Sequence, residues 1–169
     1  MLVENGGVIM ALIDVVNSNL HNQDTVLDIG CGDKVLSNQF KCKMVITLDA
    51  WEKVDPDILA DLEVEDLPFT ENSVDVVIML DFIEHLNKER GFAIIEQAKL
   101  ITRRMIILLT PLWWTDNSVN VNDKDMWYYG NEYDYHKSLW TLEDFEGWTR
   151  FTNNPDVSDT YFVGAWTKK

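Results

Sequence analysis

The residues best suited to chemistry lie where apolar runs of this sequence end. The run Val26–Ile29 contains one carboxylate, Asp28, and is followed by Gly30 and Gly32. Such a run is typical of a buried parallel strand. Glycine lets the backbone turn sharply and approach a ligand closely. Because a strand followed by a glycine turn and a helix start forms the nucleotide pockets of α/β sheets, this stretch predicts a nucleotide-containing ligand.

Two carboxylates belong to the same prediction. Asp28 lies in an apolar strand, where an unpartnered charge costs several kcal/mol, so it needs a ligand amine or the N–H groups of the glycine turn. Asp49 ends the next apolar run and could accept both hydroxyls of a ribose. Nicotinamide cofactors use the same feature, but their loops favour a third glycine at the position of Val35.

Alternating elements must position these residues. A helical spacing of apolar residues runs from Ile9 to Leu20, and a second helix is expected over 88–101, capped by Asn87. A short helix containing Val35, Leu36 and Phe40 should follow the glycine turn. Strands are expected at 25–30, 44–48, 57–60, 74–80 and 104–110. This alternation predicts a parallel sheet with right-handed crossovers.

The part of the chain after Pro111 has a different character. A polar stretch rich in aromatic residues extends to about His136, and Thr141 should then cap a helix with Asp144 three positions on. The runs at 148–152 and 160–167 are joined by a short, turn-rich connection, which favours an antiparallel hairpin. There is no repeat or linker, so residues 1–169 are expected to form a single domain, with 1–20 as an N-terminal helix.

Composition disfavours several classes of function. The 169 residues carry a formal net charge of −15, which disfavours nucleic acid and anionic membranes as partners. The two cysteines, Cys31 and Cys42, form no disulfide framework and lack metal-ligand spacing, so no metal is expected and a reducing cytoplasm is indicated. Neither a signal-peptide pattern nor a run of ~18 apolar residues is present, so no membrane association is expected.

Four segments, in order between Val26 and Phe145, carry a resemblance to a known family: VLDIGCGDK, VITLDAW, DILADLEVEDLPFTENSVDVVIMLDFIEHL and HKSLWTLEDF. The chain resembles the class I S-adenosylmethionine-dependent methyltransferases, of the small Rossmann-like type with small-molecule acceptors. The resemblance implies an α/β fold: a Rossmann-like, seven-stranded, mostly parallel sheet with helices on both faces and an antiparallel last strand. One departure is Lys34, where the family often has a third glycine.

The resemblance also implies how S-adenosylmethionine would be bound. The glycine turn approaches its methionine part, Asp49 its ribose, Asp61 and Leu62 its adenine, and Leu80 its sulfonium. An alternative register places Glu63 and Val64 at the adenine. Trp51 borders the adenosine or is a surface anchor, and Cys31 is a small filler rather than a nucleophile. The implied cofactor-binding set is Asp28, Gly30, Cys31, Gly32, Asp49, Ala50, Asp61, Leu62 and Leu80.

No catalytic residue is assigned, and three candidates stand. Asp81 could face the acceptor or the methionine amine, or cap the next helix. His85 has a pKa near neutrality and could act as a base, or it could be a structural partner of the next loop. His136 could deprotonate an acceptor, or fix its loop to the helix. Residues 111–137 form the expected acceptor-binding loop, unless their rings only cover the sheet edge or a dimer contact.

The predicted function is transfer of a methyl group from S-adenosylmethionine to an unidentified small molecule. Aromatic rings with carboxylates in the loop favour an amine or cationic acceptor. Because the cofactor carries the electrophile, the protein mainly orients the reactants, and neither a nucleophile nor a metal is needed. The alternatives are a non-catalytic S-adenosylmethionine-binding partner subunit and, lower in rank, a NAD-dependent oxidoreductase. The sequence leaves the oligomeric state open.

Overall fold

One mixed sheet forms the centre of the computed structural model, which describes residues 6–151 and 160–169. The strand order is β3-β2-β1-β4-β5-β7-β6. The first five of these are parallel, and β7 runs antiparallel to both β5 and β6. This confirms the predicted Rossmann-like sheet with an antiparallel last strand. The strands are β1 (Thr25–Ile29), β2 (Met44–Asp49), β3 (Ile58–Leu59), β4 (Val74–Leu80), β5 (Thr102–Pro111), β6 (Thr149–Arg150) and β7 (Tyr161–Thr167).

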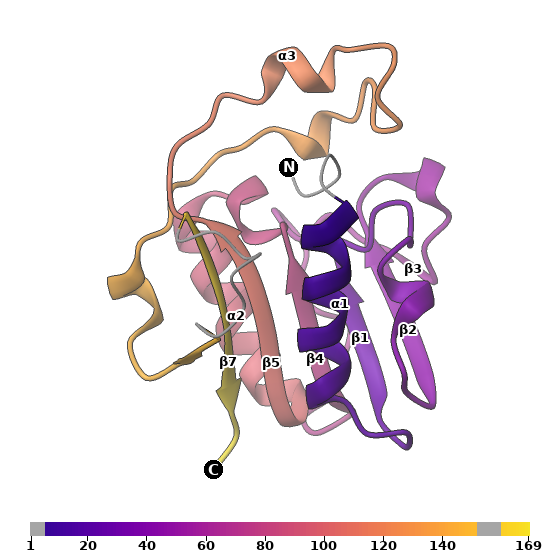
Figure 1. The fold of residues 1–169 in the computed structure, drawn as a ribbon, viewed down its shortest axis with the longest axis vertical. Coiled ribbons are helices and arrows are strands. Elements are labelled where there is room, and N and C mark those ends of the chain that lie inside the picture. The colour runs from indigo at the N-terminus through magenta and orange to yellow at the C-terminus, as the bar shows by residue number, and fades with distance from the viewer. Residues whose placement is uncertain (1–5, 152–159) are drawn as a thin grey trace.

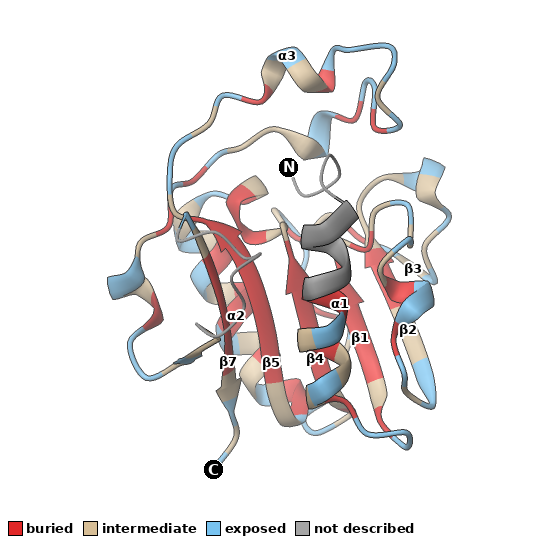
Figure 2. Ribbon diagram, viewed as in Figure 1, coloured by how far each residue is buried: buried red, intermediate tan, exposed pale blue. Residues whose placement is uncertain are grey.

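Helices cover both faces of the sheet, as predicted. Helix α1 (Gly6–Asn19) lies on one face and α2 (Lys88–Ile101) on the other (Figure 1). Each interface is a separate apolar core, and β4 between them is buried along almost its whole length (Figure 2). The remaining helices are short: α3 (Ser118–Val121) and the 3-10 turns η2 (Ser37–Gln39), η3 (Glu52–Val54), η4 (Ile83–His85), η5 (Glu132–Asp134) and η6 (Leu142–Phe145).

The short helix expected after the glycine turn is only the 3-10 turn η2. Lys34, which stands where the family often has glycine, adopts a left-handed conformation with φ of +63°. A left-handed residue cannot continue a right-handed helix. The Asp33 carboxylate then accepts from the Val35 N–H at 3.1 Å, so a side chain replaces the first helical bond.

Two other local predictions are corrected by side-chain partners. Helix α2 starts where predicted, but the Asn87 side chain makes no capping bond and instead donates to the Glu63 carboxylate. The capping box of Thr141 and Asp144 is present, yet the helix that it starts is the single 3-10 turn η6. Propensity and caps thus located the elements without fixing their lengths.

The terminal strands pair in the antiparallel sense, as the turn-rich connection predicted. Residues 152–159, which join them, lie outside the described residues. The register opposes Tyr161 to Pro111 at the end of β5, so Tyr161 reaches the carboxyl edge of the parallel strands. This edge therefore receives a side chain from the last strand of the sheet.

Residues 112–137, called the arm below, leave β5 and arch over that edge, carrying α3 and η5 (Figure 1). Trp140, three residues after the arm, is fully buried. A Cβ added at Gly91 of α2 would lie 2.6 Å from the Trp140 ring, so the packing of Trp140 on α2 needs a glycine here. Every helix in the described residues is too short or too polar to span a membrane.

Candidate active site

A cavity of about 310 Å³ lies between the carboxyl edge of the sheet and the arm. Eleven of the residues singled out in the sequence line its wall: Gly30, Cys31, Gly32, Asp49, Ala50, Asp61, Leu62, Leu80, Asp81, His85 and His136. They come from the ends of β1, β2, β3 and β4 and from the arm. Ligands of open α/β sheets bind at this edge, in the crevice where connections from neighbouring strands leave toward opposite faces.

Backbone hydrogen bonds hold the glycine turn against β2. The N–H groups of Gly30 and Cys31 both donate to the Leu48 carbonyl, at 2.8 and 3.2 Å. Gly30 has φ of +71°, a left-handed conformation, and an added Cβ would lie 2.6 Å from the Phe82 ring. Glycine is required at this position both by the turn and by the close approach of Phe82.

Asp49 closes the turn from the other side. Its carboxylate accepts from the N–H groups of Gly32 at 3.0 Å and Trp51 at 2.9 Å. Burial raises its pKa, while these N–H donors act in the opposite direction. A carboxylate offers about four lone-pair positions, so this one retains acceptor capacity toward the cavity. Ala50 lines the cavity beside it.

Asp28 lies behind the turn and does not line the cavity. It is 4% exposed, and it accepts a hydrogen bond from the Ser37 hydroxyl of η2. The sequence predicted a ligand amine or the turn's N–H groups as its partner, and Ser37 was not foreseen. Burial raises the Asp28 pKa to about 6, with Ser37 opposing the shift and the Asp49 charge adding to it.

The structure separates the two registers considered for the adenine. Asp61 and Leu62 line the cavity, and Leu62 is 2% exposed. Glu63 instead binds Asn87 and lies 3.6 Å from the Lys137 ammonium, and Val64 is 77% exposed. Only the first pair can touch a ligand in this cavity.

The end of β4 is conformationally unusual. Asp81 has φ of +57°, which is rare for a residue with a side chain and is characteristic of functional turns. Three residues on, Glu84 is 1% exposed, and its carboxylate accepts from the Thr110 hydroxyl at 2.9 Å. Burial, and then the Asp81 charge, raise the pKa of Glu84 well above its usual range.

The two candidate histidines lie together although they are far apart in the sequence. The rings of His85 and His136 are 5.0 Å apart, edge to face. Burial lowers the pKa of both, that of His85 to about 4. Nδ1 of His136 is 3.0 Å from the Thr115 carbonyl, which can only accept, so His136 carries its proton on Nδ1. Both imidazoles are therefore neutral near pH 7.

Cys31 has the properties of a filler. Burial, with the charges of Asp49 and Asp28, raises the pKa of its thiol to about 12. A neutral thiol is a poor nucleophile, so the chemistry of this site does not depend on Cys31.

Three further wall residues had no individual role assigned from the sequence, although two of them belong to the expected acceptor-binding loop. Asp134 of η5 lines the cavity, and burial, followed by the Asp81 and Asp49 charges, raises its pKa to about 7. Trp127 of the arm lies over the glycine turn, 3.1 Å from a Cβ added at Gly32. Tyr161 reaches the wall through the β5–β7 register. Aromatic content marked the arm, but no local pattern could indicate Tyr161.

Comparison with known proteins defines the class to which this architecture corresponds. Residues 27–104, from β1 into β5, match the family model of a methyltransferase domain. That segment is less than half of the 169-residue chain. It holds the glycine turn, Asp49, Asp61 and Asp81, and supports a methyltransferase as the class of protein. No curated protein matches the chain in sequence.

Solved structures share the fold at low sequence identity. A provisionally named methyltransferase from Bacillus halodurans has a TM-score of 0.61 at 17% identity, over 86% of this chain and 71% of the other. Magnesium protoporphyrin IX methyltransferase from Synechocystis, solved with S-adenosylhomocysteine, has a TM-score of 0.61 at 16% identity, over 95% of this chain and 82% of the other. A provisionally named zinc-dependent alcohol dehydrogenase from Rhodobacter sphaeroides has a TM-score of 0.66 at 11% identity, over 93% of this chain and 88% of the other. These likenesses show the fold alone, that of the Rossmann-like methyltransferases.

Proposed function

We propose that this protein transfers a methyl group from S-adenosylmethionine to a small-molecule acceptor. The observation that carries the proposal is the order of groups along one cavity. Asp61 and Leu62, then Asp49, then the glycine turn and Leu80 follow one another at the carboxyl edge. That order matches the adenine, ribose and methionine parts of the cofactor.

Each contact has a chemical reason. Asp61 would accept from the adenine amine while Leu62 lies on the ring face. The free lone pairs of Asp49 would accept from the ribose hydroxyls. The turn at Gly30 brings backbone close to the methionine part. Asp28, behind the turn, would act through η2 and the turn rather than by touching the cofactor, because it is buried and does not line the cavity.

The acceptor would enter between the strand ends and the arm. Trp113 and Tyr161 form an edge-to-face pair with ring centroids 4.8 Å apart, and both line the cavity. Asp81 and Asp134 add carboxylates to the same space. Ring faces beside carboxylates favour an amine or cationic group, which the sequence also predicted.

The reaction needs little from the protein beyond placement. The acceptor atom attacks the methyl carbon in line, the bond from carbon to sulfur breaks, and its electron pair stays on sulfur. Neutral His85 and His136 could each take an acceptor proton, and Asp81 could do so as a carboxylate. Catalytic assignment among these three remains a prediction.

Binding of S-adenosylhomocysteine tests the cofactor. We expect S-adenosylmethionine and S-adenosylhomocysteine to raise the melting temperature, and NAD to leave it unchanged. A shift with NAD and none with S-adenosylhomocysteine would instead favour an oxidoreductase, the class named for the Rhodobacter structure.

Catalysis needs a second measurement, because a cofactor-binding partner subunit would show the same shift. S-adenosylhomocysteine release should be followed across a panel of amines and hydroxylated metabolites. Release with one chemical class of acceptor is expected. Cofactor binding without release in any class would favour the non-catalytic alternative.

A further inference from the structure

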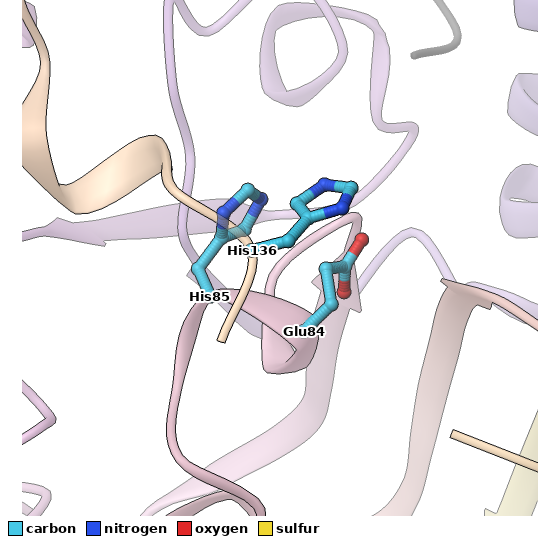
Figure 3. A group of neighbouring side chains, drawn as sticks. All are labelled: Glu84, His85 and His136. Atoms are coloured by element: carbon cyan, nitrogen blue, oxygen red, sulfur yellow. The ribbon is translucent and has the colours of Figure 1, made fainter. Parts of the chain in front are cut away.

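Three side chains outside the predicted cofactor contacts converge beside the cavity. Glu84 and His85 come from η4, and His136 comes from the arm (Figure 3). One carboxylate oxygen and one nitrogen from each imidazole lie within 4.8 Å of one another. No metal was expected from the sequence, where the two cysteines lack metal-ligand spacing, because this set of residues is brought together only by the fold.

The cluster is held in place by backbone contacts between the two elements. The N–H groups of Lys137 and Ser138 both donate to the Glu84 carbonyl, at 2.8 and 3.1 Å. The residue after His136 is thus tied to the residue before His85. Because these hydrogen bonds hold His85 and His136 next to each other, the two side chains need little reorganisation to bind one ion.

His136 is oriented as metal-binding histidines are. Its Nδ1–H donates to the Thr115 carbonyl at 3.0 Å, which leaves the lone pair on Nε2. A backbone carbonyl that fixes the tautomer in this way is a common outer partner of a ligating imidazole. The contact therefore prepares Nε2 to bind an electrophile.

Two buried polar atoms of the cluster lack partners among the described residues: Oε1 of Glu84 and Nδ1 of His85. Glu84 itself is 1% exposed. An unpartnered buried polar group costs about 1–3 kcal/mol, and more when charged. A cation held by this cluster would supply a partner for the Glu84 carboxylate.

We propose that Glu84, His85 and His136 bind one divalent transition-metal ion, such as Mn²⁺ or Zn²⁺. Two imidazoles with one carboxylate suit these ions and leave open positions for other ligands. Ligand atoms roughly 2.1 Å from one tetrahedral ion lie about 3.4 Å apart, so inward movements of roughly 0.8 Å by each side chain would complete the site.

The surroundings suit a dication. Asp81 interacts electrostatically with Glu84, His85 and His136, and Asp134 lies 4.0 Å from Nε2 of His85. Lys137 follows His136 in the chain, but its ammonium is directed to the Glu63 carboxylate, 3.6 Å away. The ion would offset negative charge that is otherwise concentrated beside the cavity.

The role of the ion rests on the proposed function. His85 and His136 line the cavity, so the open positions face the acceptor space. An acceptor hydroxyl bound there would have its pKa lowered by the ion and would lose its proton to water. Its oxygen then attacks the methyl carbon, and the carbon–sulfur electron pair remains on the leaving S-adenosylhomocysteine. A bound dication would repel a cationic acceptor, so it favours an oxygen acceptor over an amine.

Metal binding can be measured without any turnover. Chelator-treated full-length protein would be titrated with Mn²⁺ and with Zn²⁺ by calorimetry, and the bound metal counted by mass spectrometry. We expect one ion per chain, and at least a tenfold loss of affinity in His85→Ala, His136→Ala and the isosteric Glu84→Gln. The chain has three histidines, and the third, His21, is the matched control. Its side chain is 68% exposed, and His21→Ala should bind as the unchanged protein does.

Retained affinity for S-adenosylhomocysteine in the same variants shows that they are folded and separates this proposal from the cofactor proposal. Absence of a bound ion in the unchanged protein would overturn the metal site. Full affinity in both His85→Ala and His136→Ala, or its loss in His21→Ala, would overturn it as well.

Discussion

The two halves of the cavity are built in different ways. On the β1–β2 side, the wall is made by a glycine turn and by backbone N–H groups that donate to Leu48 and Asp49. On the β4–β5 side, it is made by side chains from η4, the arm and β7. The first half is local in sequence, and the second joins residues up to 80 positions apart, as Asp81 and Tyr161 are.

Because the two halves are built differently, they differ in how easily their ligand specificity can change. A backbone wall tolerates few changes, because its shape depends on left-handed residues and on close approach. A side-chain wall can change one residue at a time without disturbing the strands. We therefore expect the first half to fix the cofactor and the second to select the acceptor.

The largest expected effect comes from Gly30→Ala. The alanine would have to adopt φ of +71°, and its Cβ would lie 2.6 Å from the Phe82 ring. We therefore expect the free energy of unfolding to fall by about 3 kcal/mol and the affinity for the cofactor to fall with it. Gly130→Ala in the arm is the matched control, with φ of +74° and nothing within 4 Å, and should cost about 1 kcal/mol. Equal losses in urea denaturation would mean that the backbone half is no more constrained than the arm.

Asp28→Asn should alter how stability depends on pH. Raising the pKa of a buried carboxyl from 3.8 to about 6 favours its protonated form, so the folded state loses up to roughly 3 kcal/mol as pH rises from about 4 to 6. Asparagine avoids this loss while keeping a partner for Ser37. Relative to the unchanged protein, the variant should gain about 2 kcal/mol between pH 4 and pH 7 in urea denaturation.

The matched variant Ser37→Ala should steepen the same pH dependence, because the Ser37 hydroxyl opposes the rise in the Asp28 pKa. Asp28→Asn and the unchanged protein could instead differ in stability by the same amount at pH 4 and at pH 7. That result would show that Asp28 stays ionised. In that case a partner other than Ser37 stabilises its charge.

Asp49→Ala should weaken S-adenosylhomocysteine binding about tenfold, or about 1.4 kcal/mol, because the ribose would lose its carboxylate partner. Asp57→Ala is the matched control. Asp57 also accepts two bonds, from the N–H and hydroxyl of Thr47 at 2.8 Å each, but it does not line the cavity. Calorimetry should show weakened binding only in Asp49→Ala. Unchanged affinity in that variant would remove the ribose assignment.

The smallest effect is expected from the arm. Trp127→Ala would uncover the glycine turn at Gly32, and we expect a loss of cofactor affinity of about twofold to fivefold. Trp114 is 54% exposed and does not line the cavity, so Trp114→Ala should bind normally. A loss in Trp127→Ala as large as that in Asp49→Ala would mean that the arm shares in fixing the cofactor.

The same difference explains how much could be predicted from sequence. The strand ends, the glycine turn and the placement of Asp49 and Asp61 follow from local apolar runs and turn residues. The predicted length of the helix after the glycine turn was wrong, because the conformation of Lys34 depends on tertiary contacts. The Lys34 ammonium donates to the Asp55 carbonyl, 21 positions away in the chain.

The cluster of Glu84, His85 and His136 could not be predicted in that way. Glu84 and His136 are 52 positions apart in the sequence. Their closeness in space depends on the hydrogen bonds that the Lys137 and Ser138 N–H groups donate to the Glu84 carbonyl. Sequence patterns report periodicity and local turns, whereas a tertiary tie of this kind leaves no periodic signal. His85 and His136 were candidates individually, and their proximity is a result of the fold.

The arm is anchored at both of its ends. At its start, the Leu112 N–H donates to the Thr160 carbonyl at 2.8 Å, and at its finish Lys137 is tied to Glu84. The entropy of closing such a loop grows slowly, by about 0.6 kcal/mol for each doubling of its length. Insertions between the anchors are therefore inexpensive in stability. The arm is the part of this protein where new acceptor specificity could evolve while the sheet beneath it stays the same.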